Sequence, residues 1–216
     1  MKKIYYLFIP LIAFAIYFAI GASSQSIAEK KVQETLKDGD IIFQTSQSEQ
    51  CEAVRIATKS KFSHCGIIYD IKGKKYVYEA VQPVKITPLE DWITHGENNS
   101  YVVKRLKNAS QILTPAALQK MKDYGKDFKN KDYDLYFEWS NDKIYCSELV
   151  WKIYKNGANI ELCNLASLKS FNLSNPKVKA ILVERYGNKI PLEEQVVAPS
   201  QIESSELLET IIDTYK

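Results

Sequence analysis

Three short segments of this sequence carry side chains that together could perform nucleophilic catalysis. Ser63-His64-Cys65-Gly66 opens an apolar run, Glu79 lies in the next β-rich run, and Tyr145-Cys146-Ser147-Glu148 opens an amphipathic run. A thiol, an imidazole and a carboxylate can supply a cysteine nucleophile, its base and the group that orients the base. The residue types therefore predict a catalytic triad of Cys146, His64 and Glu79.

The position of Cys146 favours its ionised form. Apolar residues follow it at helical spacing, namely Leu149, Val150, Ile153 and Tyr154, so Cys146 is predicted in the first turn of a helix. The helix dipole and the free amide groups there favour a thiolate and would also stabilise a developing oxyanion. A cysteine at a helix start also occurs as a small buried hydrophobe, which is the alternative interpretation.

The runs that carry His64 and Glu79 are typical of a β-hairpin, with strands over His64–Asp70 and Lys75–Val81. A two-residue loop of Lys72 and Gly73 would place His64 and Glu79 diagonally on one face of the hairpin. A change of two residues in loop length would place them directly opposite, and a slip of one residue would separate them onto opposite faces. In that last case Glu79 is a surface residue and His64 a structural histidine.

The other histidine and the other cysteines have no catalytic context. His95, the second of two histidines, lies in a polar stretch and is predicted in a solvated loop. Cys65 adjoins His64, points to the opposite face of the strand and is predicted in the core. Cys51 and Cys163 could form a disulfide or stay buried. Since these residues show no paired ligand spacing, neither a metal nor an organic cofactor is predicted.

An aromatic cluster near Cys146 is either the lining of a substrate cleft or ordinary core. Its members are Tyr133, Tyr136, Phe137, Trp139, Tyr145 and Trp151. Tyr133 and Tyr145 are the candidate substrate-binding residues of this cluster.

The rest of the chain supplies the elements that position these residues. The predicted strands are Ile41–Gln44, Val84–Pro88, Tyr101–Leu106 and Ala180–Arg185, and His95–Ser100 is predicted as a loop. The predicted helices lie within Ser46–Lys61, over Leu89–Ile93, from Thr114 and Pro115 to Phe128, and from Cys146 to a stop at Gly157. Asn130–Lys143 is predicted as an irregular segment.

Composition and the N-terminus restrict the class of protein. The 216 residues, 45% hydrophobic and 25% charged, suit one globular domain over residues 25–216, and a net charge of +3 does not indicate a nucleic-acid binder. Met1-Lys2-Lys3 precedes an uncharged apolar run over Ile4–Ile20, which predicts an export signal over residues 1–24. The alternative is an uncleaved anchor that associates the protein with a membrane.

Several segments, taken in order, resemble a known family. Asp38-Gly39-Asp40-Ile41-Ile42-Phe43, Phe62-Ser63-His64-Cys65-Gly66-Ile67, Val77-Tyr78-Glu79-Ala80-Val81 and Tyr133-Asp134 followed by Tyr145-Cys146-Ser147-Glu148-Leu149-Val150 resemble the permuted papain-like members of the NlpC/P60 superfamily. Among these the chain is most similar to the YiiX/YaeF-type amidases, peptidase family C92, over roughly Leu36 to Val183. The His strand precedes the Cys helix, the reverse of the papain order. Cys65 departs from the family pattern, which has a small apolar residue there.

The resemblance implies an α+β fold in which a small antiparallel sheet packs against the Cys-bearing helix. It implies Cys146 as nucleophile, His64 as general base and then acid, and Glu79 as the residue that holds the imidazole. It also implies amide or ester bonds as targets, in small-molecule, lipid or cell-wall peptide substrates.

The sequence thus predicts an exported cysteine hydrolase, of the periplasm or cell envelope or anchored on the outer side of the inner membrane. One alternative is a lipid acyltransferase that uses the same triad and passes the acyl group to an alcohol or amine. The other is a cell-envelope binding module in which the three residues are structural.

Overall fold

The computed structural model describes residues 32–215. The predicted export signal or anchor over residues 1–24 lies outside the described residues. The chain divides into two units, Met1–Leu36 and Lys37–Lys216, and the second holds the whole sheet and the candidate site. Within the described part, no helix is both long enough and apolar enough to cross a membrane.

A six-stranded sheet in the order β4-β3-β2-β1-β5-β8 forms the centre of this unit, and all neighbouring strands are antiparallel. Its strands are β1 (Ile41–Ser46), β2 (His64–Ile71), β3 (Lys74–Glu79), β4 (Lys85–Pro88), β5 (Gly96–Leu106) and β8 (Leu208–Asp213). A second sheet pairs β6 (Ala166–Ser167) with β7 (Gln195–Val196). The antiparallel pairing confirms the predicted α+β class.

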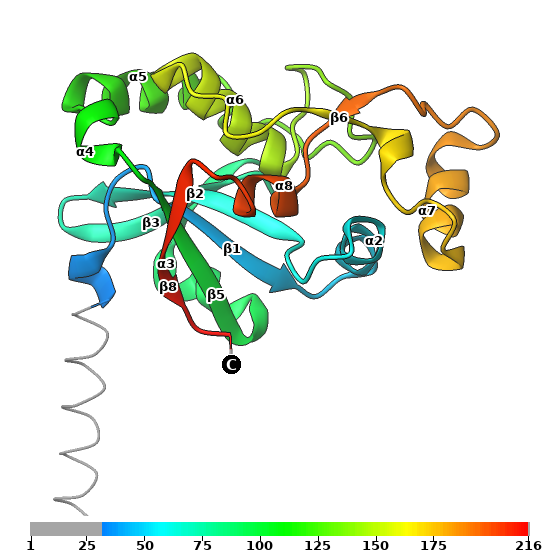
Figure 1. Cartoon of the computed structure of the whole chain (residues 1–216), viewed down its shortest axis with the longest axis horizontal. Coiled ribbons are helices and arrows are strands. Elements are labelled where there is room, and N and C mark those ends of the chain that lie inside the picture. The colour runs from blue at the N-terminus through cyan, green and yellow to red at the C-terminus, as the bar shows by residue number, and fades with distance from the viewer. Residues whose placement is uncertain (1–31, 216) are drawn as a thin grey trace, which may run out of the picture. The chain divides into compact units, whose positions relative to one another are not determined.

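The helices are α2 (Glu49–Thr58), α3 (Leu89–Thr94), α4 (Ala109–Ile112), α5 (Pro115–Lys126), α6 (Cys146–Ala158), α7 (Pro176–Tyr186) and α8 (Pro199–Glu203), with a short 3₁₀ helix, η1 (Leu168–Ser170). Helix α6 packs on β2, and α5 packs on α6 (Figure 1). Helix α3 contacts β3, β4 and β5, and α2 packs against α7. The Cys-bearing helix therefore lies directly on the strand that carries the histidine.

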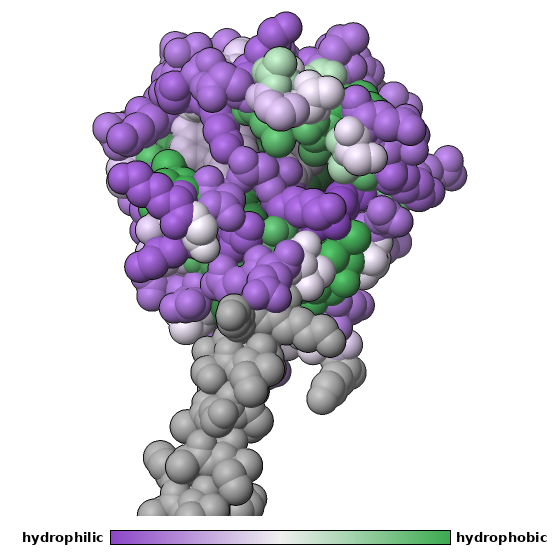
Figure 2. Space-filling view, turned by 90° about the vertical axis from the view of Figure 1, so that its left-hand side faces the viewer, coloured by the Kyte–Doolittle hydropathy of each residue, from purple (hydrophilic) through white to green (hydrophobic). Residues whose placement is uncertain are grey.

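Alternation along β2 divides its side chains between two layers. Cys65, Ile67 and Tyr69 belong to the same buried cluster as Cys146 and Leu149 of α6. The alternate residues, among them His64 and Ile68, lie on the opposite side of the strand. Figure 2 shows that hydrophilic residues cover most of one outer face of the molecule, with apolar residues visible only between them.

The hairpin of β2 and β3 has the register that a two-residue loop predicts. Ile71 pairs with Lys74, and Lys72 and Gly73 both have positive φ, 56° and 81°. These are the angles of a type I′ turn, whose twist matches that of the flanking strands. His64 and Glu79 consequently lie diagonally on one face, as expected.

Three predicted elements differ from the structure. Ala180–Arg185 is helical and belongs to α7, because Pro176 begins that helix and the Asn175 side chain accepts a hydrogen bond from the Lys177 amide. The loop predicted over His95–Ser100 is largely part of β5, which reaches the end of β1 past an irregularity between Gln44 and Ser46.

The third difference concerns the end of α6. The helix does not stop at Gly157 but continues to Ala158, and Asn159 terminates it with φ 57°. Gly157 is required by packing instead, since a Cβ at this position would lie 2.5 Å from the Met121 Cα of α5. The glycine therefore permits the close approach of α5 and α6.

Candidate active site

Cys146 is the first residue of α6, and the chain around it is fixed by several hydrogen bonds. The Glu148 Oε2 accepts from the Tyr145 amide at 3.4 Å, and the Tyr145 hydroxyl accepts from the Val197 amide at 3.1 Å. The Ser147 Oγ donates to the Val197 carbonyl at 2.7 Å. Cys146 is 3% exposed, so its thiol lies in a rigid and largely buried environment.

His64 and Glu79 are in direct contact. The His64 Nε2 lies 2.6 Å from the Glu79 Oε2, and both side chains are buried. The Trp92 Nε1 donates to the same carboxylate oxygen at 2.8 Å, and the Thr87 Oγ1 donates to Oε1 at 2.5 Å. The Trp92 ring also stacks on the imidazole, with centroids 5.9 Å apart. The carboxylate is therefore fully hydrogen-bonded, and the imidazole is fixed on one face.

The electrostatics favour a charged pair at the site. Burial by itself would lower the pKa of His64, but hydrogen bonds to Cys146 and Glu79 raise it to about 10. Burial would raise the pKa of Glu79, but the hydrogen bond and the charge of His64 hold it below its usual range. Because Nε2 contacts Glu79, the other ring nitrogen, Nδ1, is the one available to the thiol.

The pKa of Cys146 lies well below that of an ordinary thiol. The largest cause is a hydrogen bond from the Cys65 side chain, followed by the hydrogen bond and the charge of His64, which together outweigh burial. The Cys146 Sγ also lies 4.0 Å from the Ser63 carbonyl oxygen, at the start of β2. Both shifts favour an imidazolium on His64 and a thiolate on Cys146.

Cys65 behaves as predicted in one respect and differently in another. It is fully buried in the core, and its side chain lies on the opposite face of β2 from His64. However, Cys146 lies over the first residues of β2, and the side chains of both residues lower the pKa of its thiol. Strand alternation predicted the orientation of Cys65 but not this contact, which depends on where α6 begins.

Tyr133 and Tyr145 both lie at the site. The Tyr133 hydroxyl accepts a hydrogen bond from the Gln50 Nε2 at 3.2 Å, and burial, followed by the charge of Cys146, raises its pKa well above the usual range. Tyr145 packs edge-on against Phe137, with ring centroids 5.2 Å apart. Of the other aromatic residues in the predicted cluster, Trp139 and Trp151 pack against each other and against the core, and Tyr136 packs on Tyr186.

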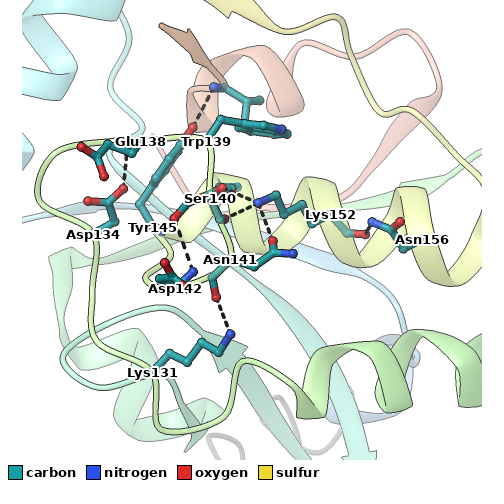
Figure 3. A network of polar contacts seen from close by, with 12 residues as sticks. Lys131, Asp134, Glu138, Trp139, Ser140, Asn141, Asp142, Tyr145, Lys152 and Asn156 are labelled. Atoms are coloured by element: carbon teal, nitrogen blue, oxygen red, sulfur yellow. Dashed lines mark hydrogen bonds and ion pairs between the residues drawn. The ribbon is translucent and has the colours of Figure 1, made fainter. Parts of the chain in front are cut away.

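A polar network holds the irregular segment between α5 and α6, which carries Tyr133 (Figure 3). The Lys152 ammonium donates to the Ser140 carbonyl and the Asn141 side chain, and pairs with Glu148 at 2.7 Å. The Asp134 carboxylate accepts from the amides of Tyr136 and Glu138. The segment therefore has fixed geometry without a regular helix or strand.

Two clefts meet at the site. An apolar cleft of about 780 Å³ lies beside Cys146, between α2 and α7, and its walls include Ala53, Val54, Leu168, Phe171, Val178, Leu182, Val196, Tyr145 and Phe137. A polar cleft of about 1010 Å³ lies beside His64 and Glu79, and its walls include Gln44, Ser46, Ser48, Gln50, Gln82 and His95. Tyr133 lines both clefts.

Sequence reasoning missed Trp92 and Thr87 as partners of Glu79, and it missed His95 as a cleft residue. Thr87 pairs with Val77 across β3 and β4, so a register for these strands would have indicated its place. Trp92 lies on a separate helix and had no such signal. Cys51 and Cys163 were left open between pairing and burial, and in the structure both are half-buried free thiols.

Comparisons with known proteins identify the family and the fold of the chain. The family model of permuted papain-like amidase enzymes of the YaeF/YiiX type, the C92 family, matches residues 35–212. The uncharacterized protein YiiX of Escherichia coli strain K12 is 46% identical over 173 residues, which cover 80% of this chain and 84% of YiiX. A crystal structure of YiiX from Escherichia coli O157:H7 has a TM-score of 0.79 and 45% identity, and the match covers 83% of this chain and 98% of that one.

The YiiX of that crystal structure is described as a metalloprotein. Over residues 32–215 of the present chain, no group of three or more His, Cys, Asp or Glu side chains could hold a metal ion. The Glu79 carboxylate is already occupied by His64, Trp92 and Thr87. The described donor set thus does not fit a protein-bound metal.

Proposed function

Because the chain belongs to the YaeF/YiiX family of permuted papain-like amidases, C92, we propose that Cys146, His64 and Glu79 form the triad of a thiol hydrolase. The observation that supports this most directly is the buried contact of 2.6 Å between His64 and Glu79 beside an acidified thiol. A thiolate, an imidazolium and an orienting carboxylate are the groups that cysteine-dependent acyl transfer requires.

In the proposed reaction the Cys146 thiolate attacks the carbonyl carbon of an amide or ester. The Cys146 backbone N–H, free at the start of α6, donates to the oxyanion that develops. His64 gives its proton to the departing nitrogen or oxygen as the bond to carbon breaks, which leaves a thioester on Cys146. Neutral His64 then takes a proton from water, the hydroxide displaces Cys146, and the carboxylic acid leaves.

The apolar cleft supports an apolar acyl group as the part of the substrate bound to Cys146. The walls of this cleft are mostly aliphatic and aromatic, and it opens at the nucleophile itself. Burial of a hydrocarbon chain there contributes about 0.8 kcal/mol per methylene. The same cleft favours the second candidate, a lipid acyltransferase, in which an alcohol or amine takes the place of water.

The N-terminal sequence supports export or membrane anchoring as part of the proposed function. Lys2 and Lys3 precede the apolar run over Ile4–Ile20, which matches an export signal and also approaches the length of a membrane span. An enzyme placed in the cell envelope by such a segment would meet acyl lipids and cell-wall peptides as substrates. A binding module without catalysis is the remaining alternative.

Replacement of single residues tests the triad. Cys146→Ala should abolish hydrolysis of an acyl ester or amide, and His64→Ala should cost nearly as much, since members of a catalytic unit are not additive. Glu79→Gln should cost less, because a neutral amide can still hold the imidazole in part. Cys163→Ala is the matched control, because burial raises the pKa of that thiol to about 11.

Three measurements distinguish the hydrolase from the acyltransferase and from the binding module. Labelling by a thiol-reactive acyl probe should occur on Cys146 and not on Cys163. Product analysis with and without an added alcohol or amine distinguishes hydrolysis from acyl transfer. A folded protein whose Cys146 does not react with iodoacetamide at neutral pH would contradict the enzyme and favour the binding module.

A further inference from the structure

The two clefts divide the catalytic residues between them. Cys146 lines the apolar cleft, whereas His64 and Glu79 line the polar cleft. Ser63, Gln50 and Tyr133 line both, so the clefts meet at the point where a scissile bond would lie.

Reaction chemistry assigns one part of the substrate to each cleft. The acyl carbon becomes bound to the Cys146 sulfur, so the acyl group must extend into the cleft that this residue lines. The leaving atom must lie where His64 can give it a proton. The group attached to that atom therefore occupies the cleft beside His64.

Neutral polar side chains form about half of the lining of the polar cleft, namely Gln44, Ser46, Ser48, Gln50, Ser63, Gln82 and the hydroxyl of Tyr133. Apolar surface comes from Cys51, Val54, Ala80, Val81 and Leu135. Among residues 32–215, no Lys, Arg or Asp lines this cleft, and the two histidines in the lining are His64, already paired with Glu79, and the exposed His95. A phosphate group would thus lack the cationic partners that its burial requires.

Gln44 is the residue of this lining that has a free acceptor. It pairs with His64 across β1 and β2, so the two side chains lie on the same face of the sheet. Gln44 is 1% exposed, and its Oε1 has no hydrogen-bond partner within the described part of the chain. Gln50 and Gln82, in contrast, already bond to Tyr133, Arg185 and Asp132.

The Gln44 Oε1 lies against Gly96, whereas the Gln44 side chain also lines the cleft. A buried amide without a partner is costly, and rotation of this side chain brings the amide to a group bound in the cleft. A hydroxyl group both donates and accepts, so it can pair with either end of the Gln44 amide. We propose that the polar cleft binds an uncharged, hydroxyl-bearing leaving group, such as a glycerol-like polyol, through Gln44. This inference rests on the proposed hydrolase function and names the leaving-group side of its substrate.

The test compares three dodecanoyl esters with the full-length protein in the same detergent: 1-monododecanoylglycerol, methyl dodecanoate and 1-dodecanoylglycerol 3-phosphate. Release of dodecanoic acid is measured as kcat/KM. The glycerol ester should exceed both others by roughly tenfold, because only its leaving group is hydroxylated and uncharged. Equal values, or a preference for the phosphate, would overturn the inference.

Two variants test whether the preference for the glycerol ester depends on Gln44. Gln44→Met should reduce the ratio of the glycerol ester to the methyl ester by roughly tenfold, because it removes the amide but keeps the length of the side chain. Gln111→Met, at an exposed position of α4, should retain the ratio. If Gln44→Met does not fold, the comparison of the three esters with the wild-type protein decides whether the cleft prefers an uncharged, hydroxyl-bearing leaving group. Absence of Cys146-dependent release from all three esters would instead refute the proposed function, and this inference with it.

Discussion

At the scale of single residues, the candidate nucleophile owes its acidity to two neighbours on one strand. The Cys65 side chain has the largest effect in lowering the pKa of Cys146, and His64 with its charge lowers it further. The contact with Cys65 arises because Cys146 lies over the start of β2, where side chains from both faces of the strand reach it. Cys65 is thus a second thiol at the site that influences the first.

This arrangement predicts the effect of changing Cys65. Cys65→Ala should raise the pKa of Cys146, because the thiolate loses a donor, and alkylation of Cys146 should need a higher pH than in the wild type. Turnover should largely persist, since the triad itself is unchanged. The measurement is the rate of iodoacetamide labelling of Cys146 as a function of pH.

Cys65→Ser is the matched variant, because its hydroxyl can donate in place of the thiol. It should shift the labelling profile less than the alanine variant does. Identical profiles for wild type and Cys65→Ala would show that the donor has no influence. Loss of all turnover in Cys65→Ala at unchanged stability would contradict the assignment of Cys65 as a neighbour rather than a member of the triad.

At the scale of elements, the first turns of α6 contain a buried ionisable pair. Glu148 is fully buried and bonds to the Tyr145 amide, and Lys152 pairs with it from the next turn. Burial raises the pKa of Glu148 to about 7, and this effect exceeds the lowering by Lys152. The start of α6 is therefore sensitive to pH.

This pKa predicts a pH dependence of stability. Because the folded-state pKa lies above the unfolded value, the contribution of Glu148 to stability is full below about pH 4.5 and is lost as the pH rises through 7. The loss amounts to roughly 3 kcal/mol. Glu148→Gln should remove this component of the slope between pH 5 and 8 in urea unfolding, whatever its effect on stability at one pH.

Lys169→Gln provides the control for that measurement, since Lys169 pairs with Glu193 at the exposed surface. Its unfolding should keep the wild-type dependence on pH. If the Glu148→Gln variant also kept that dependence, Glu148 would be ionised in the folded protein throughout the range.

At the scale of the whole molecule, the four free thiols raise the question of how they stay reduced in the compartment where the protein acts. Cys65 and Cys146 are buried, and Cys51 and Cys163 are half-buried. An exported protein meets an oxidising environment, and the proposed mechanism needs a reduced Cys146. Burial to 3% exposure protects this thiol from exchange with another protein's disulfide.

Peptide mapping under non-reducing conditions, on protein from its native compartment, should therefore find Cys146 unpaired. Cys51 and Cys163 should also be free, as in the structure. The same peptides after reduction serve as the control. A stoichiometric disulfide that includes Cys146 would contradict a constitutively active hydrolase and indicate a structural or redox-regulated residue.

The sequence by itself determined the features that depend on local periodicity and turn chemistry. Lys72 and Gly73 specified a two-residue hairpin loop, and the loop fixed the register that brings Glu79 to His64. The spacing of apolar residues after Cys146 specified α6, and Thr114 with Pro115 specified the start of α5. The order of these motifs also indicated the family, which the comparisons confirm.

Only the tertiary structure decided which distant segments meet. The apolar run over Ala180–Arg185 resembles a strand locally, but packing against α2 and capping by Asn175 make it helical. Trp92 reaches Glu79, Cys65 reaches Cys146, and two clefts meet between them, because helices and strands far apart in sequence pack together. Local patterns carry no information on such contacts, since close packing of the whole chain determines them.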